Sequence, residues 1–290
     1  MNQTLAKSPL EKAAVYWELM RPSTTCLFFL GILLGAVVVV DWQAALSVKG
    51  LLAALSGTLV GSASNVINDV FDMDIDRINK PQRPLVSGRM NISEAKSLWI
   101  ALNITGVALG FFVSLPNGII ASVSVVILYL YSSQFKRQLF IGNLVVAMVV
   151  STGLAYGAVA VGTLGDVWFP IALAFLLNVG REIVKDLEDT EGDRAGGADT
   201  IPVRYGNTAA LVLMTIVFTT LIAISFVPYL TGVYGRWYLF LMTPTTDAII
   251  LFTIIRAWQL QTKENFYRLA VLLKVAMLTG IISIALGKLQ

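Results

Sequence analysis

Histidine is absent from the 290-residue chain, and cysteine occurs only once, as Cys26. The absence of histidine excludes histidine-based acid–base catalysis, Ser-His and Cys-His dyads, and metal or haem sites with imidazole ligands. A single cysteine excludes an internal disulfide and a cysteine cluster for zinc or iron–sulfur. Any chemistry must therefore use carboxylates, amides, lysine, arginine, tyrosine or a hard metal ion.

Charged residues are also scarce, at 13% of the chain, whereas 56% of the residues are apolar. A soluble domain carries about 25% charged residues. The composition predicts an all-α, polytopic membrane protein, because a bilayer-spanning helix needs about 20 mostly apolar residues. Nine such stretches predict nine transmembrane helices, at 21–40, 48–68, 95–114, 117–135, 141–163, 167–186, 208–230, 236–258 and 267–287. We expect these helices to form a single domain, 1–290, around a central cavity with a cytoplasmic cap. Before them, residues 9–20 are typical of an interfacial amphipathic helix, with a disordered tail as the alternative.

Lysine and arginine are distributed unevenly between the two sides of this predicted bundle. With nine spans, one side and its adjoining helix ends hold 18 of the 21 basic residues, and the other side holds only Lys49, Arg236 and Lys288. Cytoplasmic loops carry such an excess. We therefore expect a multi-pass protein of the cell membrane with a cytoplasmic N-terminus and an external C-terminus.

Acidic residues gather in two short segments, Asn68–Asp76 at the end of the second span and Lys185–Asp193 at the end of the sixth. Both contain the pattern D-x-x-D-x-x-x-D, at a constant offset of 117 residues: Asp69, Asp72 and Asp76 match Asp186, Asp189 and Asp193. The offset predicts an internal repeat of four helices, with halves at about 21–135 and 141–258 and an extra span at 267–287. Both segments should then lie on the cytoplasmic side.

Helical geometry places the acidic residues of each segment on one face. At about 100° per residue, Asn68, Asp69, Asp72 and Asp76 share an arc of about 100°. Asp74 points away from that arc, and in the second segment we expect Glu188 to lie off the shared face. Stacked carboxylates repel one another, and Mg²⁺ is typically shared between carboxylates and substrate phosphates. The two segments therefore predict a cradle for Mg²⁺ and a diphosphate, with a solvated acidic loop as the alternative.

The motifs resemble those of the UbiA superfamily of intramembrane prenyltransferases. The first comprises N-D-x-x-D-x-x-x-D from Asn68, followed by R-I-N-K-P-Q-R-P and S-G-R, and the second is D-x-x-x-D at Asp189 and Asp193. The resemblance covers nearly the whole chain. Within the family, the run from Arg181 to Asp193 is most similar to that of the archaeal-type digeranylgeranylglyceryl phosphate synthases. This implies transfer of a geranylgeranyl group from its diphosphate to geranylgeranylglyceryl phosphate in ether-lipid synthesis.

The resemblance also implies roles for individual residues. Asp72 and Asp76 are expected to hold one Mg²⁺ and Asp189 and Asp193 another, and Asn68, Asp69 and Asp186 are further candidate ligands. The family places a lysine at the position of Lys136 against the diphosphate. The other expected substrate-binding residues are Asn68, Tyr131, Arg137, Arg181, Lys185, Arg21, Arg77 and Arg83. The partners expected are a prenyl diphosphate, a lipid-like acceptor and membrane lipids, with no nucleic acid and no obligate protein partner.

Other functions remain open at this point. The acceptor is alternatively an aromatic compound or a chlorophyllide, since such acceptors share the diphosphate half of the site. A cation transporter is the alternative of a different class, but its acids would be expected near the midplane of the membrane rather than at the cytoplasmic helix ends. A CDP-alcohol phosphotransferase would need a D-G-x-x-A-R signature, which the chain lacks. Asp247, within the eighth span after Pro244, is either a functional group or a structural hydrogen-bond partner.

Overall fold

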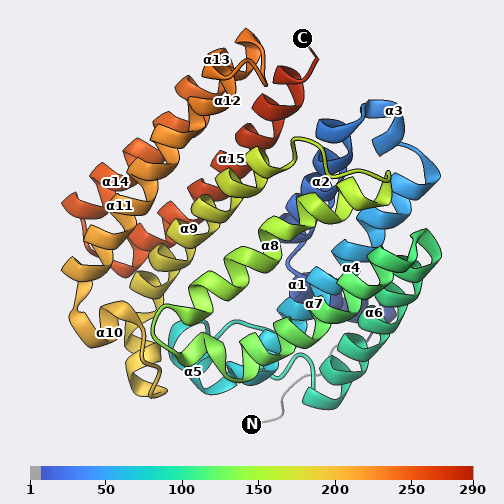
Figure 1. The fold of residues 1–290 in the computed structure, drawn as a ribbon. Helices are drawn as coiled ribbons and strands as arrows, with labels where there is room; N and C mark the ends of the chain where they lie inside the picture. Colours follow the sequence, from blue (N-terminus) through green and yellow to red (C-terminus); the bar gives the residue numbers. More distant parts are fainter. Residues whose placement is uncertain (1–7, 290) are drawn as a thin grey trace.

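The chain is helical throughout residues 8–289, the part that the computed structural model describes (Figure 1). The long helices are α1 (Pro9–Met20), α2 (Pro22–Val39), α4 (Val48–Phe71), α6 (Ile92–Val113), α7 (Leu115–Ser133), α8 (Ile141–Ala160), α9 (Trp168–Ala195), α11 (Asn207–Ser225), α14 (Ala248–Gln259) and α15 (Lys263–Gly287). The short elements are α3 (Trp42–Ala45), α5 (Met73–Asn79), the 3₁₀ turn η1 (Phe135–Arg137), α10 (Ile201–Tyr205), α12 (Val227–Leu230), α13 (Arg236–Met242) and the π-helical η2 (Thr243–Asp247). The predicted all-α class is confirmed, and residues 9–20 form a helix rather than a disordered tail.

Eight helical segments are long and apolar enough to cross a membrane, and each coincides with a predicted span to within a few residues. They are α2, α4, α6, α7, α8, Asn207–Leu230, Arg236–Gln259 and α15. The sixth predicted span, 167–186, lies within α9, a helix of 28 residues that carries the second acidic segment in its last turns. The chain is therefore a multi-pass membrane protein.

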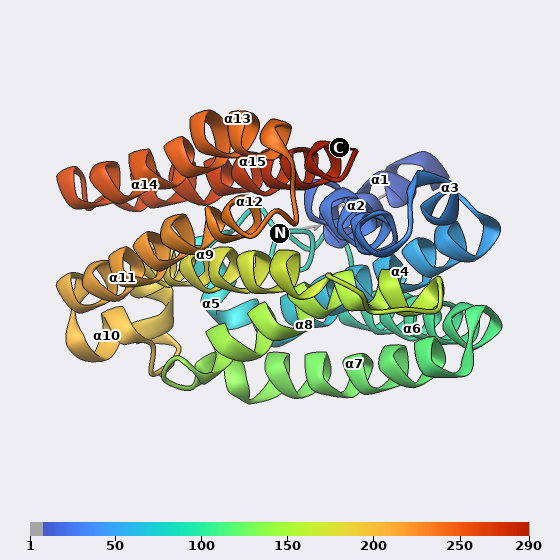
Figure 2. The same cartoon turned by 45° about the horizontal axis from the view of Figure 1, so that its top comes forward.

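The long helices form a closed ring of neighbours. Along the chain, α2 packs on α4, α4 on α6 and α7, α7 on α8, α8 on α9, and α9 on α11. The ring continues from α11 to α14 and α15, and α15 closes it against α2. Figure 2 shows α13, α14 and α15 along one side and α7 and α8 along the other, with α9 and α2 between them. This arrangement surrounds a cavity rather than a solid core.

Two glycines let α2 and α8 cross in direct backbone contact. A Cβ on Gly35 would lie 1.9 Å from the Leu154 carbonyl oxygen, and a Cβ on Gly157 would lie 1.8 Å from the Ile32 carbonyl oxygen. Small residues permit such close approach between membrane helices, where packing rather than the hydrophobic effect drives association. The crossing holds α2 against α8, the helix that precedes α9 in the chain.

Two interruptions at the ends of helices direct side chains toward the same end of the ring. Arg21 separates α1 from α2 with a φ of 58°, a left-handed conformation that is uncommon for residues other than glycine. Asp72 separates α4 from α5 with a ψ of only 1°. The first acidic segment is therefore not one continuous helix, as the shared-arc argument assumed. Asp72 and Asp76 have different cationic partners, Lys136 and Arg83.

Candidate active site

The first acidic segment buries three of its carboxylates and exposes the fourth. Asp69, Asp72 and Asp76 are each at most 4% exposed at the junction of α4 and α5. The Asp74 side chain is 83% exposed and pairs only with Arg77, one turn further along α5, at 3.0 Å. The prediction that Asp74 points away from the shared face is confirmed.

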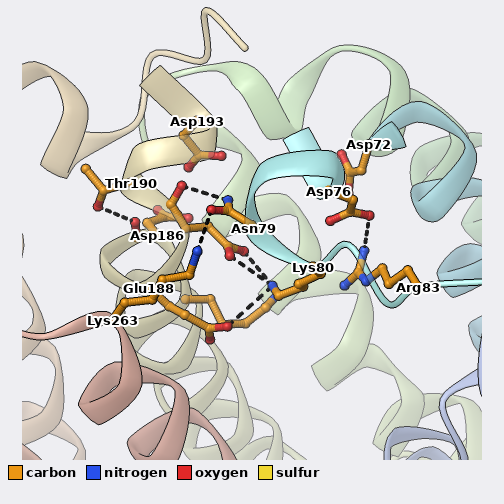
Figure 3. Close-up of polar contacts among 12 residues, drawn as sticks. Asp72, Asp76, Asn79, Lys80, Arg83, Asp186, Glu188, Thr190, Asp193 and Lys263 are labelled. Atoms are coloured by element: carbon orange, nitrogen blue, oxygen red, sulfur yellow. Dashed lines mark hydrogen bonds and ion pairs between the residues drawn. The ribbon is translucent and has the colours of Figure 1, made fainter. Parts of the chain in front are cut away.

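Cations from three separate segments neutralise the buried carboxylates. Arg83, in the loop after α5, donates to Asp69 Oδ1 at 2.9 Å. It also donates to Asp76 Oδ2, a contact that Figure 3 shows. Arg21 forms an ion pair with Asp69, and Lys136 in η1 forms one with Asp72. Buried charges are costly unless they are paired. The three carboxylates are therefore held in place by groups that also attract phosphate.

The second acidic segment keeps its carboxylates on one uninterrupted helix, α9, with different partners. Asn143 of α8 donates to Asp186 Oδ2 at 2.7 Å, and Thr200 donates to Asp193 Oδ2 at 3.5 Å. Asp189 receives both of its hydrogen bonds from Lys80 Nζ, at 2.8 and 2.9 Å. Lys80 belongs to the first motif region, so the two segments face each other, as Figure 3 shows.

The last residue of α5 and the residue that follows it join the two acidic segments. Asn79 Nδ2 donates to the backbone oxygen of Asp189 at 3.0 Å, and Lys263 at the start of α15 donates to Asn79 Oδ1 at 2.9 Å. The contact requires a glycine on α9, because a Cβ on Gly192 would lie 2.2 Å from Asn79 Nδ2. Asn79 and Lys80 therefore form the bridge between the segments, and we call these two residues the Asn79–Lys80 bridge.

Two connected hollows lie beside these residues. A small polar pocket of about 30 Å³ lies between the segments and is lined by Asp76, Lys136, Asp189 and Asp193, among others. A larger cavity of about 370 Å³ extends into the ring and is lined mostly by apolar side chains of α2, α4, α7, α8, α9 and α15. Both hollows are lined by Asn68 and Tyr131, which therefore stand where charged and apolar surroundings meet. The pair suits a ligand with an anionic head and a long hydrocarbon tail.

Comparison with known proteins identifies the family. Residues 24–278 match the UbiA prenyltransferase family. The chain belongs to this family. It is thus a prenyltransferase, and the resemblance inferred from the acidic motifs is confirmed.

Similar proteins extend over nearly the whole chain. It is 35% identical to digeranylgeranylglyceryl phosphate synthase of Thermococcus kodakarensis, over 94% of this chain and 97% of the relative. It is 31% identical to the enzyme of that name from Methanosphaera stadtmanae, over 94% of this chain and 99% of the relative. A solved structure of a digeranylgeranylglyceryl phosphate synthase shares 31% identity, with a TM-score of 0.73 over 96% of this chain and 99% of that one.

A more distant structure shares the fold. The UbiA homolog from Archaeoglobus fulgidus, bound to geranyl diphosphate (GPP) and Mg²⁺, has a TM-score of 0.69 at 20% identity, over 93% of this chain and 99% of that one. At this level of identity the likeness concerns the helical arrangement alone. The ring of helices in this prenyltransferase is therefore the UbiA fold.

Most of the residues expected at the site do meet there. The polar pocket is lined by eleven of them: Arg21, Asn68, Asp76, Arg83, Tyr131, Lys136, Arg137, Lys185, Asp186, Asp189 and Asp193. Asp69 and Asp72 lie behind them, paired with Arg21 and Lys136. Arg181 lines the large cavity instead. Arg77 is brought to neither hollow, because its side chain is 62% exposed and pairs with the outward Asp74.

Glu188 does not line the polar pocket with Asp186, Asp189 and Asp193, in keeping with its expected place off their shared face, but it is buried rather than solvated. Glu188 is only 7% exposed, lines the large cavity and lies 3.5 Å from Lys80 Nζ. Helical angles within one segment could not reveal this, because the partner comes from the opposite segment. For the same reason the sequence did not single out the roles of Asn79, Asn143 and Lys263, whose contacts all cross between helices.

Burial and neighbouring charges shift the pKa values of two groups beside the polar pocket, Asp76 and Lys136, in the same direction. Burial raises the pKa of Asp76 above its usual value, with Arg83 opposing the shift and Asp72 adding to it. Burial disfavours the charge on Lys136, but the attraction of Asp72 outweighs this and raises the pKa of Lys136. Lys136 is therefore a permanent cation at physiological pH, as a phosphate-binding group should be.

The donor atoms of the site fit a hard divalent cation. Within residues 8–289, no three acidic side chains already converge on one point. The available ligands are carboxylate and amide oxygens, which Mg²⁺ prefers. Asn68 Oδ1 is buried without a hydrogen-bond partner among the described residues, although it lines the polar pocket. An orphaned buried oxygen at this position suits a ligand of a metal ion.

Asp247 lies apart from this site. In η2 its Oδ2 accepts a hydrogen bond from Ser225 of α11 at 3.0 Å, and the Tyr238 hydroxyl donates to the Ser225 backbone oxygen. These contacts place Asp247 in a hydrogen-bonded cluster among α11, α13 and η2, which is the structural alternative weighed from the sequence.

Proposed function

We propose that this prenyltransferase moves a geranylgeranyl group from geranylgeranyl diphosphate to geranylgeranylglyceryl phosphate, in an Mg²⁺-dependent step of ether-lipid synthesis. The observation that carries the proposal is the pair of facing acidic segments around a polar pocket that adjoins the largely apolar cavity. Relatives named digeranylgeranylglyceryl phosphate synthase, with identities of 31% and 35% over 94% of the chain, support the acceptor. The fold relative bound to geranyl diphosphate and Mg²⁺ supports the donor class and the metal.

The donor diphosphate occupies the polar pocket in this proposal, and its hydrocarbon chain occupies the large cavity. Lys136, Arg83 and Lys80 each hold a carboxylate of one segment and offer N–H donors to phosphate oxygens. Tyr131 lines both hollows, so its aromatic ring lies near the carbon atom that joins the prenyl chain to the diphosphate. Aromatic faces attract cations, which favours charge development at that carbon.

Mg²⁺ would be held by Asp72 and Asp76 on one side and by Asp189 and Asp193 on the other, with Asn68, Asp69 and Asp186 as further ligands or as supports. When bound, Mg²⁺ neutralises the charge that develops on the leaving diphosphate oxygens. Lys136, Arg83 and Lys80 would then be free to turn from the carboxylates toward the phosphate oxygens. The ion pairs of the structure thus hold each group close to the position that the substrate needs.

The reaction breaks the bond between the allylic carbon and the diphosphate oxygen, and the diphosphate leaves with the electron pair. The hydroxyl oxygen of the acceptor forms the new carbon–oxygen bond and releases its proton, so that an ether and free diphosphate result. Water would compete for the same carbon. A site enclosed by the helix ring and covered by the Asn79–Lys80 bridge excludes it.

The membrane arrangement in this proposal comprises nine spans in one domain covering residues 1–290, because α9 is added to the eight apolar segments. The charged residues that distinguish α9 from the eight apolar segments begin at Arg181, near the middle of the helix, where α9 lines the two hollows. The two similarly spaced acidic segments support repeat-like halves. The basic excess on their side supports a cytoplasmic site and N-terminus, with the C-terminus outside.

The acceptor is tested by incubating the purified protein with geranylgeranyl diphosphate, Mg²⁺ and single acceptors, with products identified by mass spectrometry. We expect geranylgeranylglyceryl phosphate to be prenylated and 4-hydroxybenzoate to remain unchanged. Prenylation of the aromatic acid alone would reject the proposed acceptor and leave the family assignment standing. A parallel flux measurement in liposomes should detect no cation transport.

The orientation is tested with cysteines placed singly at positions 2 and 289, after replacement of Cys26 by serine. In sealed vesicles of known orientation, a membrane-impermeant thiol reagent should label one of the two and not the other. Labelling of both cysteines from the same side would contradict nine spans.

A further inference from the structure

A lone lysine, Lys274, lies within the last membrane span and lines the large cavity. It is eleven residues beyond Lys263, which contacts the Asn79–Lys80 bridge, and this places Lys274 about 16 Å further along the helix axis. An ionisable side chain within a membrane span is costly and calls for a partner. Its one hydrogen bond among the described residues is to the hydroxyl oxygen of Ser23, at 2.8 Å, near the start of α2.

The charged groups that act on Lys274 are all cationic. They are Arg181 and Lys185 of α9 and Arg21. Arg21 has Asp69 as its partner, whereas Arg181 and Lys185 share the single carboxylate of Glu182, at 3.2 and 2.8 Å. No carboxylate among residues 8–289 lies within 4 Å of Lys274 Nζ. The corner of the cavity between α2, α9 and α15 therefore carries more positive charge than the single carboxylate of Glu182 balances.

This corner is distinct from the polar pocket of the diphosphate. Arg181 and Lys274 line the large cavity and not the polar pocket, whereas Arg21 and Lys185 line both. Arg181 Nε is also buried without a hydrogen-bond partner within the described part of the chain. The Arg181 Nε–H has no acceptor, and Lys274 has no carboxylate partner. Together they indicate a binding place for an anion that accepts hydrogen bonds.

We propose that Lys274 and Arg181, which both line the large cavity, form a binding site for a phosphate monoester: the phosphate of the acceptor. The inference rests on the proposed function, and it adds a second anion site beside the one for the donor diphosphate. A phosphate monoester carries a charge of about −1.5 to −2 at pH 7. It would balance the remaining positive charge of this corner.

The position of the corner suits the reaction. In geranylgeranylglyceryl phosphate the phosphate and the attacking hydroxyl are attached to the same three-carbon glycerol unit, so they lie only a few bonds apart. Arg21 and Lys185, which line both hollows, connect the corner with the diphosphate pocket. A phosphate held at Lys274 therefore keeps the hydroxyl close to the allylic carbon. The same site discriminates against acceptors without phosphate, since their binding leaves the cations unpaired.

The test compares Lys274→Met, which removes the charge, with Lys274→Arg, which retains it. The matched control is Lys96→Met, which alters an exposed lysine on α6. Binding of geranylgeranylglyceryl phosphate and of its dephosphorylated form, geranylgeranylglycerol, is measured by calorimetry on the purified full chain in nanodiscs of phosphatidylcholine. Steady-state kinetics then give kcat/KM for both acceptors and KM for geranylgeranyl diphosphate.

We expect Lys274→Met to weaken binding of the phosphorylated acceptor about 10- to 100-fold, the range for loss of a charge-assisted hydrogen bond. Binding of geranylgeranylglycerol and KM for the donor should stay unchanged. Lys274→Arg should restore most of the affinity, and Lys96→Met should have no effect. Equal losses for both acceptors, or no loss for either, would overturn the proposal. Loss of kcat/KM without loss of affinity, restored by phosphatidylglycerol in the nanodiscs, would assign Lys274 to a lipid headgroup and equally overturn it.

The proposed function and the phosphate site can be tested separately. If the wild type binds the phosphorylated acceptor in a Lys274-dependent way but does not prenylate it, the phosphate site stands and the acceptor assignment is wrong. If the wild type prenylates the acceptor while Lys274→Met binds it normally, the acceptor assignment stands and the phosphate site is wrong.

Discussion

The two acidic segments share one spacing but have different local structures. The first changes direction at Asp72, and its carboxylates pair with strong cations from elsewhere in the chain, namely Arg21, Arg83 and Lys136. The second stays on the continuous helix α9, and two of its three aspartates are held by an amide and a hydroxyl. The same sequence pattern therefore occurs in two different local structures, with different partners for its carboxylates.

The difference indicates that the two acidic segments contribute different groups to the site. The first segment is followed by basic residues of its own, because Lys80 and Arg83 come directly after α5 and both line the polar pocket. The second supplies carboxylates on a rigid helix, aligned by the contact of Gly192 with Asn79. The predictions that follow, ordered from the largest effect to the smallest, test whether both halves are needed and how they are joined.

Loss of one carboxylate from either segment should be most damaging. We expect Asp72→Asn and Asp189→Asn each to slow turnover at least about 100-fold, which corresponds to about 2.7 kcal/mol of transition-state stabilisation. Asp76→Asn and Asp193→Asn should behave alike. Turnover is measured with saturating Mg²⁺ on protein whose unfolding transition is unchanged. An effect confined to one segment would mean that the halves do not share one diphosphate.

Removal of the Lys136 cation should cost less. Lys136→Met takes away one charge-assisted hydrogen bond to the leaving group, worth about 1.5–3 kcal/mol, so we expect kcat/KM for the donor to fall about 10- to 100-fold. Lys96→Met, on the exposed surface of α6, is the control and should leave kcat/KM unaltered. A normal rate in Lys136→Met would remove this lysine from the diphosphate site.

A methyl group at the junction between the segments should destabilise the fold. In Gly192→Ala the new Cβ meets Asn79 Nδ2 at 2.2 Å, and we expect the free energy of unfolding to fall by about 1–3 kcal/mol. Gly280→Ala is the control, because its Cβ would meet Thr246 at an ordinary 3.7 Å. The free energies of unfolding of the two variants are compared by denaturation in detergent. Equal values would show that the Asn79–Lys80 bridge can move aside without loss of stability.

The smallest effect is expected for the outward carboxylate of the first segment. Asp74 and its partner Arg77 are both largely exposed, and such surface pairs contribute little. Asp74→Asn should change the free energy of unfolding by no more than about 0.5 kcal/mol and should retain most of the turnover. If Asp74→Asn slowed turnover as much as Asp72→Asn in folded protein, the claim that Asp72 faces the site and Asp74 faces away from it would be wrong.

The sequence predicted the elements of this molecule better than their contacts. Apolar runs located the spans to within a few residues, because bilayer thickness fixes the length of a helix. The helical period correctly separated Asp74 from Asp72. It did not predict the break at Asp72 or the burial of Glu188, whose partner Lys80 comes from the opposite segment. Contacts such as Lys263 with Asn79, far apart in the sequence, depend on how the ring closes, which no local pattern encodes.

The central claim, that both acidic segments hold one donor diphosphate through Mg²⁺, is tested most directly by donor binding. An unreactive thio-analogue of geranylgeranyl diphosphate is titrated into the wild type, Asp72→Asn and Asp189→Asn, each with Mg²⁺ and with chelator. We expect tight binding only by the wild type with Mg²⁺, and weakening of about 100-fold in both variants and in chelator. Binding that is indifferent to Mg²⁺, or that survives intact in either variant, would contradict the account.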